Sequence, residues 1–135
     1  MSGKSPEVKL GYVIVYVANV GETVRFYEQA FGLTRGFVHE SGQYAEMETG
    51  QTALAFAHEK ASTIPLAFTP NRAGNAPAGA EVALVIADPH AAFAKAVAAG
   101  AAAVLEPTEK PWGQTVSYVR DLNGFVVELC SPVRQ

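Results

Sequence analysis

The stretch EVALVIADPHAAFAKAVAAG, residues 81–100, reveals the architecture of the chain because its pattern occurs twice. Its aliphatic first part predicts a strand, and Asp88 followed by Pro89 is typical of a helix N-cap and a first helical residue. A matching strand, turn and helix run from Val13 to Gly32, in a segment one residue longer than Val82 to Gly100. The sequence therefore predicts two copies of one supersecondary module rather than a solenoid of short repeats.

Three short strands follow each of the two predicted helices, so that each module has the order βαβββ. The six strands are expected at residues 34–40, 43–49, 52–59, 102–107, 115–121 and 125–131. A segment rich in Gly, Pro and Asn, residues 71–80, separates the two halves. We therefore expect a single domain over residues 1–135, with module one at about 8–62, a connecting loop at about 63–79 and module two at about 80–132.

The composition fits a packed globular domain and argues against several classes of function. Hydrophobic residues make up 49% of the 135 positions, and the formal net charge is -3. No Lys- or Arg-rich run is present, so we expect no nucleic-acid partner. No apolar run approaches the roughly 20 residues that span a bilayer, so we expect no membrane association. The single cysteine, Cys130, and the absence of a signal-peptide pattern in the first residues predict a cytoplasmic protein.

Three segments together resemble a known superfamily. They are FYEQAFGL (26–33), AVAAGAAAV (96–104) and KPWGQTVSYVRDLNGFVVEL (110–129). In this order, and within a doubled βαβββ pattern, they resemble the vicinal oxygen chelate superfamily, which includes glyoxalase I, fosfomycin-resistance enzymes, extradiol dioxygenases and bleomycin-resistance binding proteins. The resemblance spans about Leu10 to Pro132. It implies an α+β fold in which two βαβββ modules form a curled mixed sheet around a cleft.

The resemblance also implies where a metal centre would lie, at four strand positions that are Tyr12, Ala55, Glu81 and Glu128 in this sequence. The metal enzymes of the superfamily place His, Glu or Gln there, whereas this chain has no histidine at any of the four. Zinc, nickel and iron sites favour imidazole and need about three protein ligands. We therefore expect no metal and no other cofactor. The alternative is a divalent metal held weakly by Glu81 and Glu128.

Glu128 interrupts the apolar strand in DLNGFVVELCSP, residues 121–132, which raises the question of what its carboxylate faces. Strand alternation puts the aliphatic residues on one face and Glu128 on the other. Glu81 likewise lies opposite the aliphatic residues of its own strand. We expect both carboxylates in the cleft, where a close approach would make them share a proton. The alternative is that each is an ordinary strand residue facing solvent.

Four aromatic residues complete the predicted ligand-binding set: Tyr12, Tyr16, Trp112 and Tyr118. Tyr12 and Tyr16 share the face of the first strand that does not suit the helix. Trp112 follows a Lys-Pro pair in an expected loop at the mouth of module two, where either stacking on a flat ligand or simple packing fits. The facing of Tyr118 and Arg120 depends on the register of the turn that follows them, and the sequence leaves both directions open.

These features favour a small-molecule-binding protein of the bleomycin-resistance type, which binds a drug-like or metabolite ligand in an acidic, aromatic cleft without the usual His-containing metal site. The resemblance implies a homodimer. The alternative is a glyoxalase-like lyase, isomerase or dioxygenase that uses an atypical metal site, or metal-free acid–base catalysis with Glu128 as the catalytic base. The fold alone does not choose between these functions, because the scaffold supports many chemistries.

Overall fold

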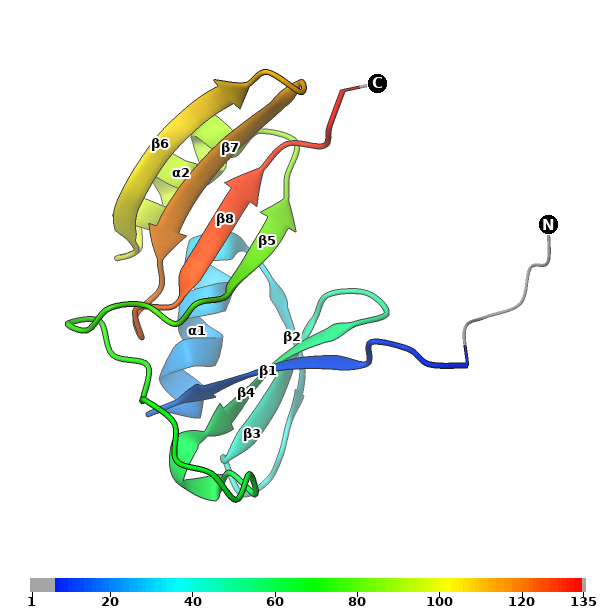
Figure 1. Cartoon of the computed structure of the whole chain (residues 1–135), viewed down its shortest axis with the longest axis vertical. Coiled ribbons are helices and arrows are strands. Elements are labelled where there is room, and N and C mark those ends of the chain that lie inside the picture. The colour runs from blue at the N-terminus through cyan, green and yellow to red at the C-terminus, as the bar shows by residue number, and fades with distance from the viewer. Residues whose placement is uncertain (1–6, 135) are drawn as a thin grey trace.

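A computed structural model describes residues 7–134, and in it the chain forms two βαβββ modules (Figure 1). Module one contains β1 (Tyr12–Val17), α1 (Val20–Phe31), β2 (Thr34–Val38), β3 (Tyr44–Glu48) and β4 (Ala53–His58), followed by the short 3-10 helix η1 (Glu59–Ala61). Module two contains β5 (Glu81–Val85), α2 (Pro89–Ala98), β6 (Ala102–Lys110), β7 (Gln114–Arg120) and β8 (Val126–Cys130). The doubled order of elements that the sequence predicts is confirmed.

Each module builds one four-stranded mixed sheet, and the two sheets have the same topology. The strand orders are β1-β4-β3-β2 and β5-β8-β7-β6. The first strand of each module pairs in parallel with the last, and the remaining pairs are antiparallel. Figure 1 shows the sheet of module two bending over α2, and neither sheet closes into a barrel. The chain is therefore an α+β protein with two open, curled sheets.

The two α-helices begin and end near the capping residues that the sequence supplies. The Asn19 side chain accepts a hydrogen bond of 2.9 Å from the amide of Glu22 at the start of α1, and Gly32 ends this helix at a φ of 70°, which favours glycine. Asp88 caps α2 by accepting a bond of 3.2 Å from the amide three residues later, and Pro89 is the first helical residue. Within residues 7–134, no helix is both long enough and apolar enough to cross a membrane.

Strand β6 is longer than the sequence indicated, because it continues through Pro107 to Lys110. Proline cannot donate a backbone hydrogen bond, so strands that contain it lie at sheet edges or at bulges. β6 satisfies both conditions: it is an edge strand, and its pairing with β7 shifts register between Leu105 and Thr108, on either side of the proline. The expectation that this strand ends at Pro107 was wrong, and Trp112 lies in the tight turn between β6 and β7.

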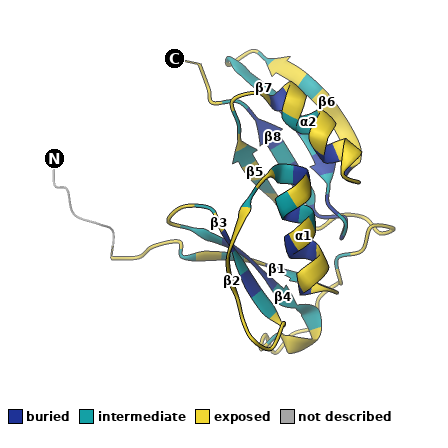
Figure 2. Cartoon of the chain, turned by 180° about the vertical axis from the view of Figure 1, so that it is seen from behind, coloured by how far each residue is buried: buried dark blue, intermediate teal, exposed yellow. Residues whose placement is uncertain are grey.

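The hydrophobic core lies between the helices and the sheets, where the dark blue, buried positions concentrate in Figure 2. In β1, Val15 and Val17 are buried, whereas Tyr12 on the opposite surface is exposed. In β8, Val127 and Leu129 have no exposed surface. This alternation agrees with the faces predicted from the sequence. It leaves the sheet surfaces opposite the helices free of core packing.

The turn between β7 and β8 joins the two modules through a buried polar network. Asp121 accepts a hydrogen bond of 2.6 Å from the Tyr27 hydroxyl of α1. The same carboxyl group accepts bonds from the backbone amides of Asn123 and Phe125, at 2.8 and 2.9 Å. The Asn123 side chain donates to the Thr23 hydroxyl of α1 at 3.1 Å. These contacts fix α1 of module one against the sheet of module two.

The segment between η1 and β5 has no regular helix or strand, but polar contacts hold it against both modules. The Asn71 side chain donates to a backbone carbonyl of β1 at 2.9 Å, and Arg72 forms an ion pair of 2.6 Å with Glu59. From module two, the Arg120 guanidinium donates to the carbonyl of Asn75 at 2.6 Å. The structure thus settles the direction of Arg120, which the sequence left open: its side chain serves the linker.

Candidate functional site

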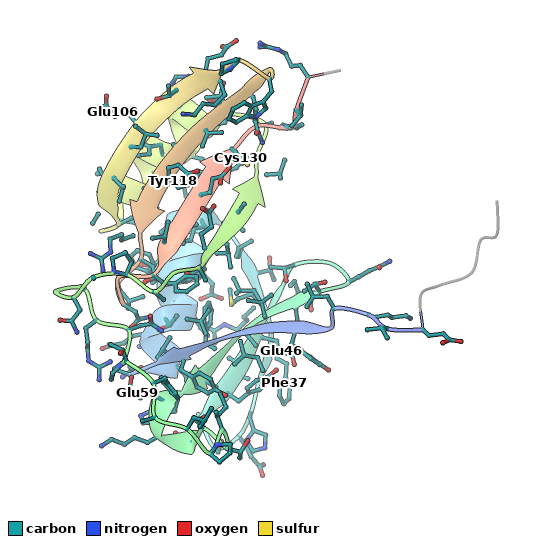
Figure 3. All side chains as sticks on the ribbon, in the orientation of Figure 1. Phe37, Glu46, Glu59, Glu106, Tyr118 and Cys130 are labelled. Carbon is teal, nitrogen blue, oxygen red and sulfur yellow. The ribbon has the colours of Figure 1, made fainter. Side chains whose placement is uncertain are left out.

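Each sheet has a surface opposite its helix, which we call the inner face. Figure 2 shows α1 and α2 on the same side of the two sheets, so both inner faces point to the other side of the molecule. Side chains with labels in Figure 3 mark the two faces: Tyr118 and Cys130 belong to module two, and Phe37 and Glu46 to module one. Because core and inner-face residues alternate along each strand, the polar residues that interrupt apolar strands gather on these faces.

The inner face of module two brings three of the predicted residues together: Glu81 on β5, Tyr118 on β7 and Glu128 on β8. Glu128 lies directly opposite Tyr118 on one side and opposite Ala83 on the other. Glu81 comes two residues before Ala83, so it shares the same face and lies diagonally beside Glu128. The small alanine leaves the space between the two carboxyl groups open. The structure therefore directs Tyr118 toward Glu128.

The neighbouring carboxyl group of Glu128 raises the pKa of Glu81. A hydrogen bond between the Glu81 and Glu128 side chains is the main cause that raises the pKa of Glu81 from 4.5 to about 7, and burial and the charge of Glu128 add to the effect. Two carboxyl groups can bond to one another only when one of them is protonated. Below neutral pH Glu81 therefore holds a proton, which it can donate in a hydrogen bond.

The same carboxylate raises the pKa of two further side chains of module two. Burial, the charges of Glu128 and Glu81 and a hydrogen bond to Glu128 raise the pKa of Tyr118. Burial and then a hydrogen bond to Glu128 raise the pKa of the Cys130 thiol to about 11. Since the thiolate is the reactive form, Cys130 is a poor nucleophile at neutral pH. Both groups remain protonated near neutral pH, and the Cys130 thiol donates a hydrogen bond to the Leu84 carbonyl at 3.8 Å.

Trp112 lies at the end of this face and is connected to the cluster through Gln114. The indole nitrogen donates to Gln114 Oε1 at 2.7 Å, and Gln114 Nε2 donates to the carbonyl of Ser131 at 3.0 Å. Gln114 also hydrogen-bonds Cys130, and this contact lowers the pKa of the thiol. Burial and the nearby carboxyl groups raise that pKa by more, so the net shift is upward. The indole is 57% exposed, so its ring is oriented by one polar contact while its faces stay accessible.

The remaining predicted residues, Tyr12 and Tyr16, lie on the inner face of module one. Tyr16 packs against Phe68 of the linker, with ring centroids 5.0 Å apart, and Tyr12 is 59% exposed. Among the described residues, no hydrogen bond or aromatic contact links either tyrosine to Glu81 or Glu128. The ligand-binding set predicted from the sequence is therefore divided between two surfaces.

Sequence reasoning missed Tyr44 and Glu46 on β3 of module one. The Tyr44 hydroxyl donates to Glu46 Oε2 at 2.8 Å, on the same inner face as Tyr12. The signal was present in the alternation of YAEME, residues 44–48, where Ala45 and Met47 are buried and the polar residues face the other way. The resemblance points to metal positions on first and last strands only, whereas β3 is an interior strand of its sheet.

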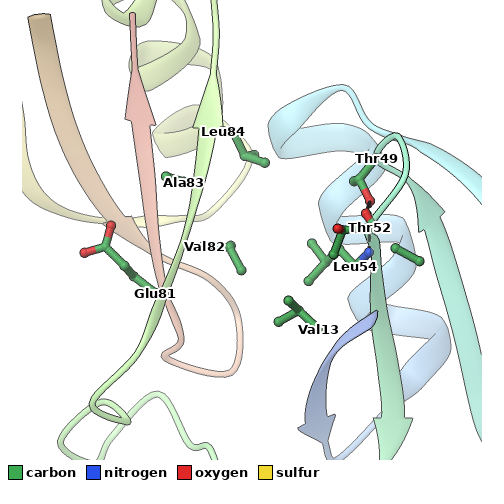
Figure 4. Close-up of a pocket in the computed structure, with 9 residues that line it drawn as sticks. Val13, Thr49, Thr52, Leu54, Glu81, Val82, Ala83 and Leu84 are labelled. Atoms are coloured by element: carbon green, nitrogen blue, oxygen red, sulfur yellow. Dashed lines mark hydrogen bonds between the residues drawn. The ribbon is translucent and has the colours of Figure 1, made fainter. Parts of the chain in front are cut away.

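A crevice of about 270 Å³ lies between the modules, on the core side of the strands. Figure 4 shows Val82 and Leu84 of β5 directed toward Val13 and Leu54 of module one, while Glu81 points the opposite way. The crevice is therefore mainly apolar, and the carboxyl group of Glu81 belongs to the inner face.

The donor set of module two does not fit the three-ligand metal centre that the superfamily implies. It offers two carboxyl groups that share a proton, a phenol and a protonated thiol, with no imidazole. In the part of the chain that the structure describes, no three His, Cys, Asp or Glu side chains are grouped so that they could hold a metal ion.

Several solved structures have a fold similar to that of this chain. A glyoxalase-related enzyme from Fulvimarina pelagi is 19% identical, with a TM-score of 0.77 over 92% of this chain and 88% of that one. TioX from Micromonospora sp. ML1 is 21% identical, with a TM-score of 0.70 over 92% and 98%. A superfamily member from Sphaerobacter thermophilus is 17% identical, with a TM-score of 0.71 over 93% and 98%.

These three likenesses show the fold. In a comparison of sequences with curated proteins, none matches. The family model described as Glyoxalase/Bleomycin resistance protein/Dioxygenase superfamily matches residues 9–129, which is most of the chain. The chain therefore belongs to the glyoxalase/bleomycin resistance protein/dioxygenase superfamily.

Proposed function

We propose that this protein binds a drug-like or metabolite small molecule on the acidic, aromatic inner face of module two, without a His-containing metal site. The observation that carries the proposal is the cluster of Glu81, Glu128 and Tyr118 on an open sheet surface. Glu128 is half-buried and Glu81 is exposed, and the two neighbouring acids have no basic side chain as an ion-pair partner among the described residues. A ligand that supplies a better partner would relieve this repulsion.

The chemistry of the cluster indicates which groups a ligand would present. The proton-sharing pair accepts a hydrogen bond at its charged oxygens and donates one through its proton, so a hydroxyl group fits. A cationic group fits as well, because it would stabilise the fully ionised pair and release the proton. Trp112 supports the same proposal, since its exposed ring faces could stack on a flat part of the ligand.

A thermal-shift screen of hydroxylated and cationic small molecules tests this proposal. Compounds that bind the cluster should raise the melting temperature of the wild type and of the control Glu106→Gln, which removes an exposed carboxylate from β6. The same compounds should stabilise Glu128→Gln much less. If no compound stabilises the wild type, or if every active compound stabilises Glu128→Gln equally, the proposal is wrong.

A second candidate function is metal-free acid–base catalysis by the same pair. The observation that favours it is the raised pKa of Glu81, at about 7, which places a proton donor and acceptor side by side near neutral pH. In this version Glu128 is the base and Glu81 holds it in place. Turnover of a screened ligand that disappears in Glu128→Gln, with binding of the ligand retained, would favour catalysis. Binding without turnover would favour the first function.

We also propose a homodimer in which a second copy covers the edge of β5. β5 is an edge strand of its sheet, and Val85 on it is 66% exposed, a combination typical of surfaces that pair with another chain. Light scattering coupled to gel filtration should give twice the monomer mass. Val85→Lys should shift the population toward monomer, while Val104→Lys at the far edge of the same sheet should not.

A further inference from the structure

The inner face of module one holds a carboxylate among aromatic rings, and we propose that it binds a small organic cation, namely a protonated amine on an aromatic or alkyl group. The residues are Tyr12, Phe37, Tyr44 and Glu46, and we call them the aromatic cup. They are distinct from the Glu81–Glu128 cluster. The proposal stands whether or not the function proposed for that cluster is correct.

The register of the sheet explains how these side chains gather. Glu46 on β3 lies opposite Phe37 on β2 and opposite Ala55 on β4. Tyr44, the next inner-face residue of β3, lies opposite Ala57. Because β4 presents only alanines to this face, the long side chains of the strands on either side can lean over it. β1 contributes Tyr12, two residues before the position opposite Ala55, and its phenol makes the smallest contribution to the raised pKa of Tyr44.

The hydrogen bonds of the cup leave the carboxylate partly unsatisfied. Tyr44 donates to Glu46 Oε2 at 2.8 Å. Burial, this hydrogen bond and the charge of Glu46 raise the pKa of Tyr44 to about 12, so the phenol remains a neutral donor at neutral pH. Within residues 7–134, no side chain or amide donates to Glu46 Oε1. The ion pairs of the same residues involve other carboxylates: Glu28, Glu59 and Glu109.

The rings around this carboxylate are accessible from outside. Phe37 is 50% exposed and Tyr12 is 59% exposed, and the rings of Phe37 and Tyr44 have centroids 6.5 Å apart. A cation over an aromatic ring face is attracted by the ring quadrupole, and an N–H donor that reaches Oε1 would add a charge-assisted hydrogen bond. An anion would be repelled by Glu46, and a neutral ligand would gain neither effect. The cup therefore selects for positive charge.

The test compares a charged probe with its neutral counterpart. Phenethylammonium and 2-phenylethanol have similar shape, but only the first carries a charge at neutral pH. Titration calorimetry, with NMR shifts to locate the probe, should show saturable binding of phenethylammonium and binding of 2-phenylethanol that is about tenfold weaker or more. Benzyltrimethylammonium, which keeps the charge but has no N–H donor, should bind with an intermediate affinity.

Variants then separate the aromatic cup from the cluster of module two. Glu46→Gln should weaken phenethylammonium binding about tenfold or more, and Phe37→Ala should weaken it several-fold. The exposed control Glu106→Gln should retain the wild-type affinity. Circular dichroism and thermal melting confirm that each variant is folded, and Tyr44→Phe, which keeps the ring, is a second variant that should weaken binding only slightly.

The proposal is overturned if neither ammonium probe binds the wild type, or if 2-phenylethanol binds as tightly as phenethylammonium. It is also overturned if binding is lost in Glu128→Gln and kept in Glu46→Gln, since the cation would then occupy the module-two cluster. That last outcome would support the function proposed for module two. Loss in Glu46→Gln alone, with no ligand found for module two, would leave the aromatic cup as the binding site and reject the earlier proposal.

Discussion

The inner faces of the two modules have the same strand register but a different arrangement of charge. In module two the carboxyl groups lie on β5 and β8, at Glu81 and Glu128, and β7 supplies Tyr118 opposite Glu128. By register, the corresponding positions of module one are Tyr12, Ala55 and Glu46. At these three positions module two thus has two carboxyl groups and a phenol, and module one has a phenol, an alanine and a carboxyl group.

This difference shows that a duplicated scaffold sets positions, while single residues set the chemistry at those positions. Two adjacent carboxyl groups must share a proton because their full ionisation is disfavoured, and this raises the pKa of Glu81 to about 7. In module one the Glu46 carboxylate accepts a hydrogen bond from a phenol instead, and burial together with this bond raises the pKa of Tyr44 to about 12. We therefore expect module two to handle protons and module one to recognise charge.

The largest loss of stability is expected from a substitution at the contact between the two modules. The same measurement tests whether the modules unfold together as one cooperative unit. Asp121→Ala removes the acceptor for the Tyr27 hydroxyl and for two backbone amides, all of them buried. The free energy of unfolding should fall by about 3 kcal/mol, because the donors are left without partners. Urea denaturation followed by tryptophan fluorescence and circular dichroism measures it. Two separate transitions in the wild type would contradict a single cooperative unit.

Copying the module-two carboxylate into module one should make the two faces alike. Ala55→Glu places a second carboxyl group opposite Glu46, at a position that has no exposed surface. The variant should lose about 2 kcal/mol of stability at neutral pH, from overpacking and from repulsion between the two acids. Part of this loss should be recovered at acidic pH, where one acid is protonated. Equal destabilisation at all pH values would mean that steric strain alone is responsible.

The proton shared in module two should make stability depend on pH. Folding raises the pKa of Glu81 above its unfolded value of 4.5, so the folded state binds the proton more tightly. The resulting stabilisation is complete below pH 4.5 and is lost as pH rises through about 7. We expect a loss of about 1 kcal/mol, a value reduced for solvent screening because Glu81 is exposed. Denaturation at a series of pH values measures this loss.

Glu81→Gln should flatten that pH profile, while the control Glu106→Gln should keep the wild-type slope. A wild-type profile that rises with pH across the same interval would reverse the sign and reject the shared proton.

The smallest effect is expected from removing single phenol hydroxyls. Tyr44→Phe and Tyr118→Phe each delete a donor to a partly exposed carboxylate, so each should cost less than about 1 kcal/mol. The consequence for proton binding should differ between the modules: Tyr118→Phe removes a donor from the proton-sharing cluster, whereas Tyr44→Phe lies in the other module. Carbon-13 NMR of the glutamate carboxyl groups should therefore show a shifted titration of Glu81 in Tyr118→Phe only.

Much of the fold could be predicted from the sequence because its signals are local. The doubled βαβββ order follows from strand and helix periodicity, and capping residues such as Asn19 and Asp88 mark the helix starts. Strand alternation also assigned the faces of Glu81 and Glu128. The extension of β6 through Pro107 escaped prediction because proline normally ends a strand, and only the edge position of β6 in the assembled sheet makes it acceptable.

The sequence by itself determined two modules, their α+β class and the strand faces of Tyr12, Tyr16, Glu81 and Glu128. These properties follow from the periods of helices and strands, which depend on neighbouring residues alone. Only the tertiary structure decided which of those residues meet. It joined Tyr118 to Glu128, separated Tyr12 and Tyr16 from them, and added the pair of Tyr44 and Glu46. The reason is physical: strand pairing and register bring together residues far apart in the chain, and no local pattern specifies that pairing.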